Sequence, residues 1–258
     1  MSRIPVKTGS AGTLGRRSFV KLCATSAAAI SASPQILAQG SAAPLKLYQR
    51  VRLTNSLGEP LKASRLDPGT SHIFNYPYAT TPCFLLNLGK PVTDGVTLHT
   101  AAGAPYFWPG GVGSGRSVVA FSAICAHKMS HPAEAVSFIN YRHESVNYRD
   151  RHEQLTTRDG VILCCSEKSV YDPAKGASVL GGPARQPLCS ILLEFDDADD
   201  ALYALGSFGG EMFDQFFARF GPRLQMEWGT SNLREVVSGT AQVVPISEYS
   251  RTQMMCGT

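Results

Sequence analysis

Two short stretches of the chain contain side chains of the types that bind metal ions. The first is AICAHKMSHP, in which Cys125 and His127 are separated by one residue. The second is VILCCSEKSVYDP, in which Cys164 and Cys165 are followed by Glu167. Thiolate, imidazole and carboxylate groups are common protein ligands of iron and zinc. The two stretches therefore predict a metal site formed by two loops.

Both stretches follow a predicted β-strand. Residues 117–125 form a β-branched run that ends at Cys125, and residues 160–165 form a second apolar run that ends in the two cysteines. Alternating or short apolar runs bounded by turn residues predict further strands. These runs lie at residues 45–55, 83–88, 96–100, 190–195 and 202–208, the last two joined by an acidic turn. The pattern predicts an all-β protein, an antiparallel sandwich or small barrel.

Helix is expected in one place only. Residues 209–224 carry apolar side chains at helical spacing and should form an amphipathic helix that covers the sheet. These side chains are Met212, Phe213, Phe216, Phe217 and Phe220. Residues 138–160 are polar with mixed charge, and they are expected to form a long surface excursion between the two metal-binding stretches.

The first 43 residues have the features of an export signal. Arg16 and Arg17 precede Ser18, Phe19 and Lys21, and a weakly apolar stretch rich in Ala and Ser follows. A pair of arginines before such a stretch is typical of a twin-arginine signal. We therefore expect the twin-arginine translocation machinery to export the protein to the periplasm. No clear cleavage site is evident, so an uncleaved signal could also anchor the protein to the membrane.

Composition limits the remaining possibilities. The chain has 258 residues, of which 43% are hydrophobic and 17% charged, so residues 44–258 are expected to form a single domain. Five of the 24 Lys and Arg residues lie in the predicted signal, which leaves 19 basic and 20 acidic residues. No basic patch remains that would favour nucleic acid. No apolar run is long enough for a strong transmembrane helix.

Three loops of the chain resemble those of one known family. They read SAICAHKMS, CCSEKSVYD and GASVLGGPARQPL. Together they are similar to the loops of the Rieske [2Fe-2S] iron–sulfur proteins, such as the Rieske subunits of cytochrome bc complexes and arsenite oxidase. The resemblance implies a β base domain with a smaller cluster-binding β subdomain at about residues 120–188.

The resemblance also implies roles for individual residues. Cys125 and Cys164 match the thiolate ligands of one iron, and His127 matches one of the two imidazole ligands of the other. Ser169 and Tyr171 match residues that give hydrogen bonds near the sulfurs of the cluster, which raise its reduction potential. In the third loop, Pro183 would help to keep water away.

The chain departs from the family pattern at several positions. The loop-bridging disulfide of the family would require cysteines at Ser130 and Ser166, and both are missing. Cys165 stands where the family often has proline. The second histidine ligand is replaced by Glu167.

Four residues could provide the fourth ligand. Glu167 could bind through its carboxylate, because hard oxygen suits ferric iron. Cys165 could supply a thiolate, although adjacent residues of a strand point in opposite directions. His131 could reach over from the first loop. Lys168 is the poorest candidate, because its amine is protonated at neutral pH.

The sequence leaves three functional hypotheses. In the first, the chain is a periplasmic electron-transfer subunit with a [2Fe-2S] cluster, and it passes single electrons to or from a larger redox enzyme or a cytochrome. It would then be part of an oxidoreductase complex rather than a self-contained enzyme. In the second, it is a degenerate Rieske-fold subunit that binds a partner without a cluster. In the third, it holds a different metal centre, such as zinc or mononuclear iron. The pairing of Cys83, Cys189 and Cys256 cannot be read from the sequence.

Overall fold

The computed structural model describes residues 45–256 of the chain. All of them belong to one compact unit, Ser41–Thr258. The predicted export signal, residues 1–43, lies outside the described residues. Within residues 45–256, no helix has both the length and the apolar character that crossing a bilayer requires.

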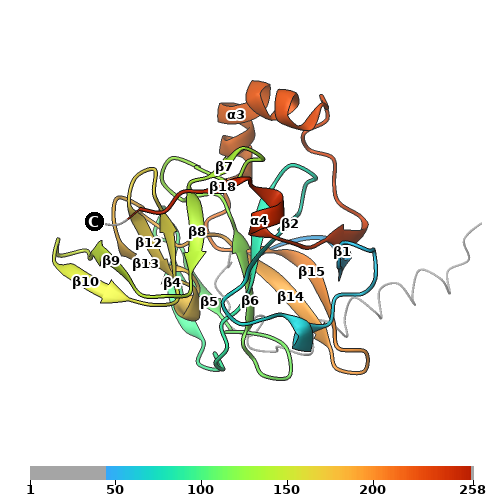
Figure 1. Cartoon of the computed structure of the whole chain (residues 1–258), viewed down its shortest axis with the longest axis horizontal. Coiled ribbons are helices and arrows are strands. Elements are labelled where there is room, and N and C mark those ends of the chain that lie inside the picture. Colours follow the sequence, from blue (N-terminus) through green and yellow to red (C-terminus); the bar gives the residue numbers. More distant parts are fainter. Residues whose placement is uncertain (1–44, 257–258) are drawn as a thin grey trace, which may run out of the picture. The chain divides into compact units, whose positions relative to one another are not determined.

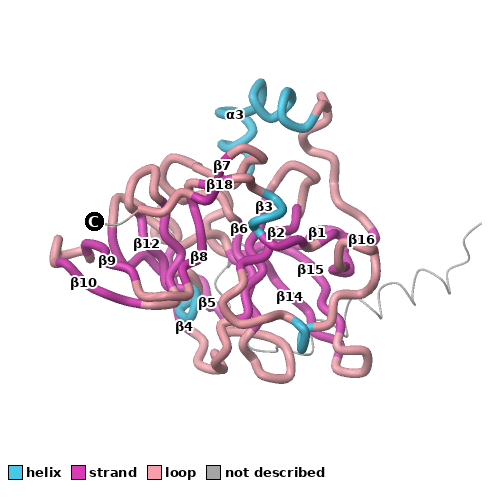
Figure 2. The backbone as a smooth tube through the Cα atoms, viewed as in Figure 1, coloured by secondary structure: helices cyan, strands magenta, loops and turns pink. Residues whose placement is uncertain are grey.

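The larger of two main sheets has eight strands (Figures 1 and 2). Their order is β16 (Gly239–Gln242), β1 (Leu45–Thr54), β15 (Ala201–Phe208), β14 (Ser190–Asp196), β6 (Val118–Ser122), β3 (Pro82–Asn87), β2 (Ser71–Asn75) and β17 (Val244–Pro245). The two end strands, β16 and β17, are separated along the chain by Val243 alone. The sheet therefore nearly closes on itself, and the predicted all-β fold is confirmed.

Both faces of this sheet are buried, because successive side chains of a strand point to opposite faces. In β3, Phe84 and Leu86 belong to one apolar cluster, and Leu85 belongs to another on the opposite face. In β6, Phe121 and Ala120 are divided in the same way. The uninterrupted apolar sequence of β6 reflects burial on both sides.

The smaller main sheet has four strands and carries the second metal-binding stretch. Their order is β13 (Ser178–Gly181), β12 (Ser169–Asp172), β11 (Val161–Cys164) and β8 (Ile139–Arg142). One face of this sheet, including Ile162 and Tyr171, packs in the same apolar cluster as Phe84 and Phe121 of the large sheet. The two sheets lie side by side in Figure 1. This shared core fixes the position of β11 relative to β6.

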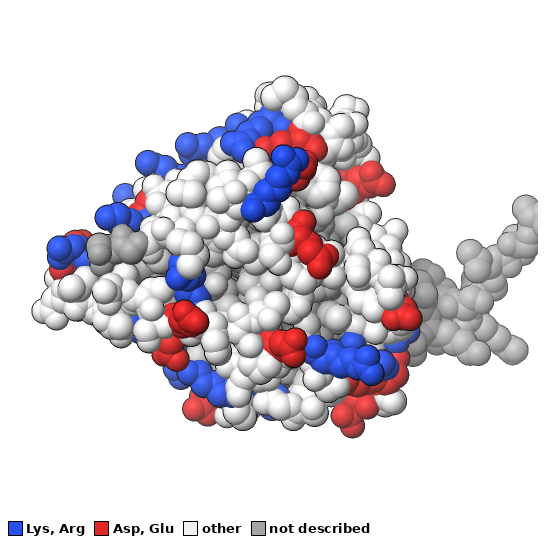
Figure 3. Space-filling view, viewed as in Figure 1, with Lys and Arg blue, Asp and Glu red and all other residues white. Residues whose placement is uncertain are grey.

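Pairs of short strands and short helical turns complete the β structure. The pairs are β4 (Val96–His99) with β5 (Pro105–Trp108), β9 (Val146–Arg149) with β10 (Leu155–Arg158), and β7 (Val136–Ser137) with β18 (Thr252–Gln253). The short helical turns are η1 (Ala63–Arg65), η2 (Pro173–Lys175) and α4 (Ile246–Tyr249). On the face drawn in Figure 3, acidic and basic side chains are interspersed, and several basic ones gather beside α3.

The long helix forms as the spacing of its aromatic residues predicts. Helix α3 (Phe213–Trp228) buries Phe213, Phe216 and Phe217. They pack against Ile124 and Met129, which flank Cys125 and His127 in sequence. The helix therefore supports the first metal-binding loop. The predicted hairpin with the acidic turn is also confirmed, as β14 and β15 pair antiparallel.

One expectation holds only in part. Residues 143–160 are mostly exposed and form the β9–β10 hairpin, but residues 139–142 form β8 of the small sheet. Strand β8 is an inner part of the structure, with Ile139, Asn140 and Tyr141 buried. The sequence does not predict this buried strand, because the polar residue Asn140 interrupts its apolar run. The NH2 group of the Asn140 side chain donates to the carbonyl oxygens of Ser137 and Met254, at 3.1 Å each.

Candidate metal centre

The first loop of the site follows β6 and turns sharply around Cys125. The amide of Met129 donates to the Cys125 carbonyl at 2.9 Å, and the amide of Cys125 donates to the Ser130 carbonyl at 2.9 Å. Met129 adopts a positive φ of 61°, which closes the turn. As a result, the Cys125 side chain is fully buried, whereas the side chain of His127 remains 37% exposed.

The second loop is the hairpin turn between β11 and β12. Cys164 and Ser169 are paired residues, so residues 165–168 form the turn. Lys168 has a positive φ of 61°, and its amide donates to the Cys164 carbonyl at 2.7 Å. The Lys168 side chain is exposed, but that of Glu167 is only 5% exposed. The turn therefore directs the carboxylate of Glu167 inward.

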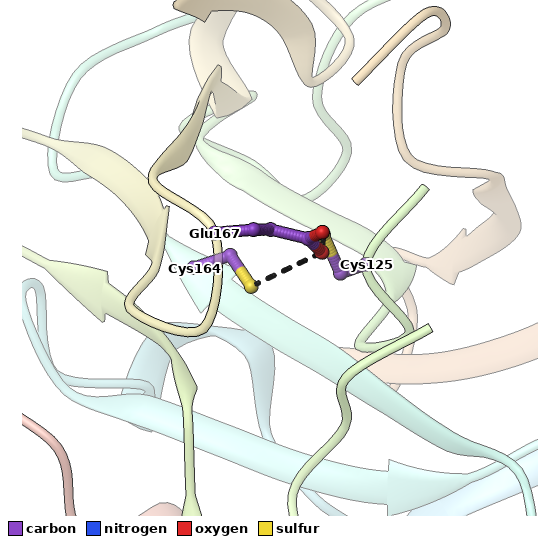
Figure 4. A group of neighbouring side chains, drawn as sticks. All are labelled: Cys125, Cys164 and Glu167. Carbon is purple, nitrogen blue, oxygen red and sulfur yellow. Dashed lines mark hydrogen bonds between the residues drawn. The ribbon is translucent and has the colours of Figure 1, made fainter. Parts of the chain in front are cut away.

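The two loops bring two thiols and a carboxylate together (Figure 4). Oε1 of Glu167 lies 3.1 Å from Sγ of Cys125 and 3.9 Å from Sγ of Cys164. One ligand atom from each of these three residues lies within 4.8 Å of the others. This is the spacing of groups that could hold a metal.

Glu167 also contacts the backbone and the imidazole of the first loop. The Lys128 amide donates to Oε1 at 3.0 Å. Oε2 lies 2.5 Å from Nδ1 of His127, yet it is buried and has no aligned hydrogen-bond partner. A buried carboxylate oxygen without a donor is costly unless a positive charge compensates it. Oε2 is therefore a carboxylate oxygen that a bound cation would stabilise.

Two hydroxyl groups of β12 complete the surroundings of the sulfurs. The hydroxyl of Tyr171 lies 3.2 Å from Sγ of Cys125 and accepts a hydrogen bond from the Ala126 amide at 3.1 Å. The hydroxyl of Ser169 is buried and has no partner within the described residues. An additional sulfur acceptor, such as the sulfide of an iron–sulfur cluster, would satisfy the Ser169 hydroxyl. The donor set of the site therefore suits such a cluster.

The two thiols influence each other's ionisation. The hydrogen bond with Cys164 is the main cause that raises the pKa of Cys125 well above the usual thiol value, and burial adds to it. The same hydrogen bond lowers the pKa of Cys164, although burial opposes this shift.

The other candidates for the fourth ligand are occupied elsewhere. Cys165 forms a disulfide with Cys256, with Cα atoms 5.5 Å apart. The ring of His131 packs edge-on against Phe216 and Phe220 of α3, with centroid distances of 4.8 and 5.2 Å. Nδ1 of His131 lies 3.0 Å from the Met129 carbonyl oxygen. The side chain of Lys168 is exposed, whereas that of Glu167 lies with the two thiols.

The third loop packs directly on the second. Gly182 has a positive φ of 76°, and a Cβ atom on it would lie 2.3 Å from the Lys168 carbonyl oxygen. Only glycine permits this close approach. The next residue, Pro183, is exposed at the outer side of the loop, whereas Ala184 is buried in the core cluster that contains Cys125 and Cys164. The loop therefore covers the second metal-binding stretch.

The disulfide was the main feature of the site that sequence reasoning missed. Cys256 lies 91 positions after Cys165 and is part of no recognisable motif. The alternation of side chains along a strand did indicate that Cys165 points away from Cys164. That signal weakened Cys165 as a candidate ligand, but it neither excluded Cys165 nor identified its partner.

The nearly closed β-sheet, the two ligand loops and the covering third loop are the features that the resemblance to the Rieske proteins implied. No protein-family model matches the chain. The chain is 28% identical over 202 residues to the iodate reductase subunit IdrB of Pseudomonas sp. (strain SCT), a match that covers 78% of this chain and 83% of that protein. Among solved structures, it is similar to the soluble domain of the Rieske protein II (soxF) from Sulfolobus acidocaldarius. The identity is 22% and the TM-score 0.41, over 62% of this chain and 78% of that one. The chain is thus similar to a reductase subunit over most of its length and, more remotely, to a Rieske protein, in line with the predicted resemblance.

Proposed function

We propose that the chain is a periplasmic electron-transfer subunit with a Rieske-type [2Fe-2S] cluster, and that it exchanges single electrons with a larger redox enzyme. The observation that carries this proposal is the convergence of two thiols and an inward carboxylate from two adjacent loops, with the His127 imidazole against the carboxylate. The match to a subunit of an iodate reductase supports a catalytic reductase subunit as the partner.

In this proposal, Cys125 and Cys164 hold one iron as thiolates, and His127 and Glu167 hold the other. The bound cluster would take up and release one electron at a time. The Tyr171 hydroxyl, 3.2 Å from Sγ of Cys125, would donate to that sulfur and favour the reduced state.

Glu167 should lower the reduction potential relative to a two-histidine site. Two-histidine Rieske sites cover roughly −150 to +300 mV, in part because neutral imidazoles replace anionic thiolates. A carboxylate restores one negative charge and disfavours the additional electron. It also removes one of the two histidines whose ionisation would couple the potential to pH.

His127 is the metal-site candidate that a partner could approach most closely, because its side chain is partly exposed. A pocket of about 850 Å³ adjoins it and is lined by Ala126, His127, Arg185 and Gln186, among others. We infer that the partner docks on this side, where the path for an electron is shortest.

The periplasmic location rests on two features. One is the twin-arginine pattern at Arg16 and Arg17, which could also serve as an uncleaved membrane anchor. The other is the Cys165–Cys256 disulfide, because disulfides persist mainly in oxidising compartments.

The test is a metal analysis of anaerobically purified protein, with iron and sulfide measured on one sample and an EPR spectrum after reduction with dithionite. We expect about two irons and two sulfides per chain and the signal of a reduced cluster. Glu167→Ala should alter the spectrum, and Glu167→His should raise the potential. Glu144→Ala, at an exposed turn position, serves as the matched control and should change neither. A protein without iron after anaerobic reconstitution would refute the proposal.

A single metal ion is a second candidate that one observation favours. In a tetrahedral zinc site, ligand sulfur and oxygen atoms lie about 3.6 Å apart, as follows from the usual Zn–S and Zn–O distances. Oε1 of Glu167 lies 3.1 and 3.9 Å from the two sulfurs. One equivalent of metal without sulfide would favour this centre. If the protein binds no metal, the remaining hypothesis is the degenerate Rieske-fold subunit that binds a partner without a cluster.

A further inference from the structure

The C-terminal segment, residues 250–256, runs from the end of the first ligand loop to the turn of the second. It begins beside residues 133–134, where Oγ of Ser250 donates to the Ala133 carbonyl at 2.7 Å. The amide of Arg251 donates to the Glu134 carbonyl at 2.8 Å, and the two side chains form an ion pair. The segment is thus attached a few residues after His131, where the first loop leaves the site.

The middle of the segment pairs as a strand with the residues that follow the first ligand loop. Strand β18 (Thr252–Gln253) pairs in parallel with β7 (Val136–Ser137). The amide of Met254 then donates to the Ser137 carbonyl at 2.9 Å. The side chain of Asn140 donates to the Met254 carbonyl at 3.1 Å, which connects the segment to β8. Figure 1 shows β18 beside β7 and β8.

The end of the segment is joined covalently to the second loop. Cys256 is bonded to Cys165, the first residue of the turn that carries Glu167. Cys256 also packs against the apolar cluster formed by Val146, Tyr148, Val161, Leu163 and Val170 on the outer face of the small sheet. The amide of Cys165 donates to the Phe138 carbonyl at 2.6 Å, so the same turn is fixed from the side of β8 as well.

We propose that residues 250–256 act as a clasp that positions Glu167 against the first loop. The clasp fixes residue 165 relative to residues 133–140, and Glu167 lies two residues further along the same four-residue turn. The carboxylate then reaches the Lys128 amide and Sγ of Cys125. Ser130 and Ser166 cannot join the two loops covalently, and the Cys165–Cys256 disulfide joins them indirectly. Cys165 and Cys256 are therefore positioning residues.

The disulfide has a second consequence for the site. Cys165 is adjacent to the candidate ligand Cys164, and as a free thiol it would be a competing ligand or oxidation partner. Its bond to Cys256 removes the thiol from both reactions. This part of the inference rests on the proposed metal-binding function, whereas the positioning of Glu167 does not.

The test measures amide hydrogen exchange by NMR in the metal-free Cys165→Ser/Cys256→Ser double variant. Two amides report on the clasp: that of Lys128, bonded to Glu167, and that of Lys168, bonded to the Cys164 carbonyl. We expect both to exchange about tenfold faster or more than in the wild type. Amides of β14 and β15 report global opening. The matched control is the wild-type protein in urea at the concentration that gives the same unfolding free energy.

Each outcome decides the proposal. Faster exchange at Lys128 and Lys168, beyond that in the urea control, supports the clasp. Unchanged exchange overturns it, and so does a uniform increase that equals the control, because the disulfide would then stabilise the whole domain only. Titration of wild type and double variant with Co²⁺ separates this result from the proposed function. A wild type that binds no metal but shows the exchange difference refutes the function and leaves the clasp in place.

Discussion

Replacing Tyr171 by phenylalanine removes one hydroxyl from the centre of the site and leaves the ring in place. The side chain is fully buried and packs in the core cluster that contains Cys125 and Cys164. Its hydroxyl accepts from the Ala126 amide at 3.1 Å and contacts Sγ of Cys125 at 3.2 Å. Tyr171→Phe therefore leaves a partly buried amide without a partner, and loses the contact with the thiol.

The expected cost follows from these two contacts. A polar group left without a partner costs about 1–3 kcal/mol, and a typical net hydrogen bond contributes about 1 kcal/mol. We expect the unfolding free energy of Tyr171→Phe to fall by about 1–3 kcal/mol, because the Ala126 amide dominates and the thiol is a weak partner. The ring fills the same volume, so no cavity adds to this cost.

The assay is urea unfolding of the metal-free protein, followed by the fluorescence of the buried Trp108, in buffer without reductant so that the disulfide persists. The control is Tyr76→Phe, which loses one hydrogen bond to the Gln49 carbonyl at 3.1 Å in a different core cluster. Both variants should lose stability, but only Tyr171→Phe should alter the spectrum of metal bound at Cys125. A Tyr171→Phe protein as stable as the wild type, with an unchanged metal spectrum, would refute this account of the hydroxyl.

Three further predictions can be tested in the same unfolding assay. Phe216→Ala should lower the unfolding free energy by about 3–5 kcal/mol, because a fully buried ring is lost between α3 and the first loop. The double variant Cys165→Ser/Cys256→Ser should lose up to about 4–5 kcal/mol, since its disulfide closes a loop of 91 residues; a change below about 1 kcal/mol would contradict this. Burial lowers the pKa of His72 and of His131, so the unfolded chain binds protons first, and stability should decline as the pH falls below about 6.5. His131→Asn, which retains a side-chain N–H, should reduce that slope between pH 7.5 and 5.5.

The sequence predicted those features that depend on local periodicity. The β14–β15 hairpin follows from two apolar runs around an acidic turn, and α3 follows from aromatic residues at helical spacing. In both elements the buried side chains recur at regular spacing, so the apolar pattern can be recognised in the sequence. The two ligand loops were found for a different reason, because Cys and His are rare and their spacing is restricted by chemistry.

The features that the sequence did not reveal depend on contacts between distant segments. Strand β8 has a polar residue, Asn140, in a buried position, and its NH2 group donates to the Met254 carbonyl of the C-terminal segment. The Cys165–Cys256 disulfide joins the same two regions. No local pattern records either contact, because the paired residues are 114 and 91 positions apart in the sequence.

The fourth-ligand position illustrates how the fold selects among chemically plausible residues. The sequence offered Glu167, Cys165, His131 and Lys168, and local chemistry alone could not separate them. The fold removes Cys165 by a covalent bond and His131 by packing against α3, and it turns Lys168 outward at a positive φ. Glu167 then remains, buried beside two thiols, with Oε2 facing an imidazole at 2.5 Å and no aligned donor. A buried carboxylate in that position is costly unless a positive charge compensates it, and a bound metal would supply one. The two thiols beside the carboxylate are themselves common metal ligands. Their presence therefore favours a metal ion as the compensating charge.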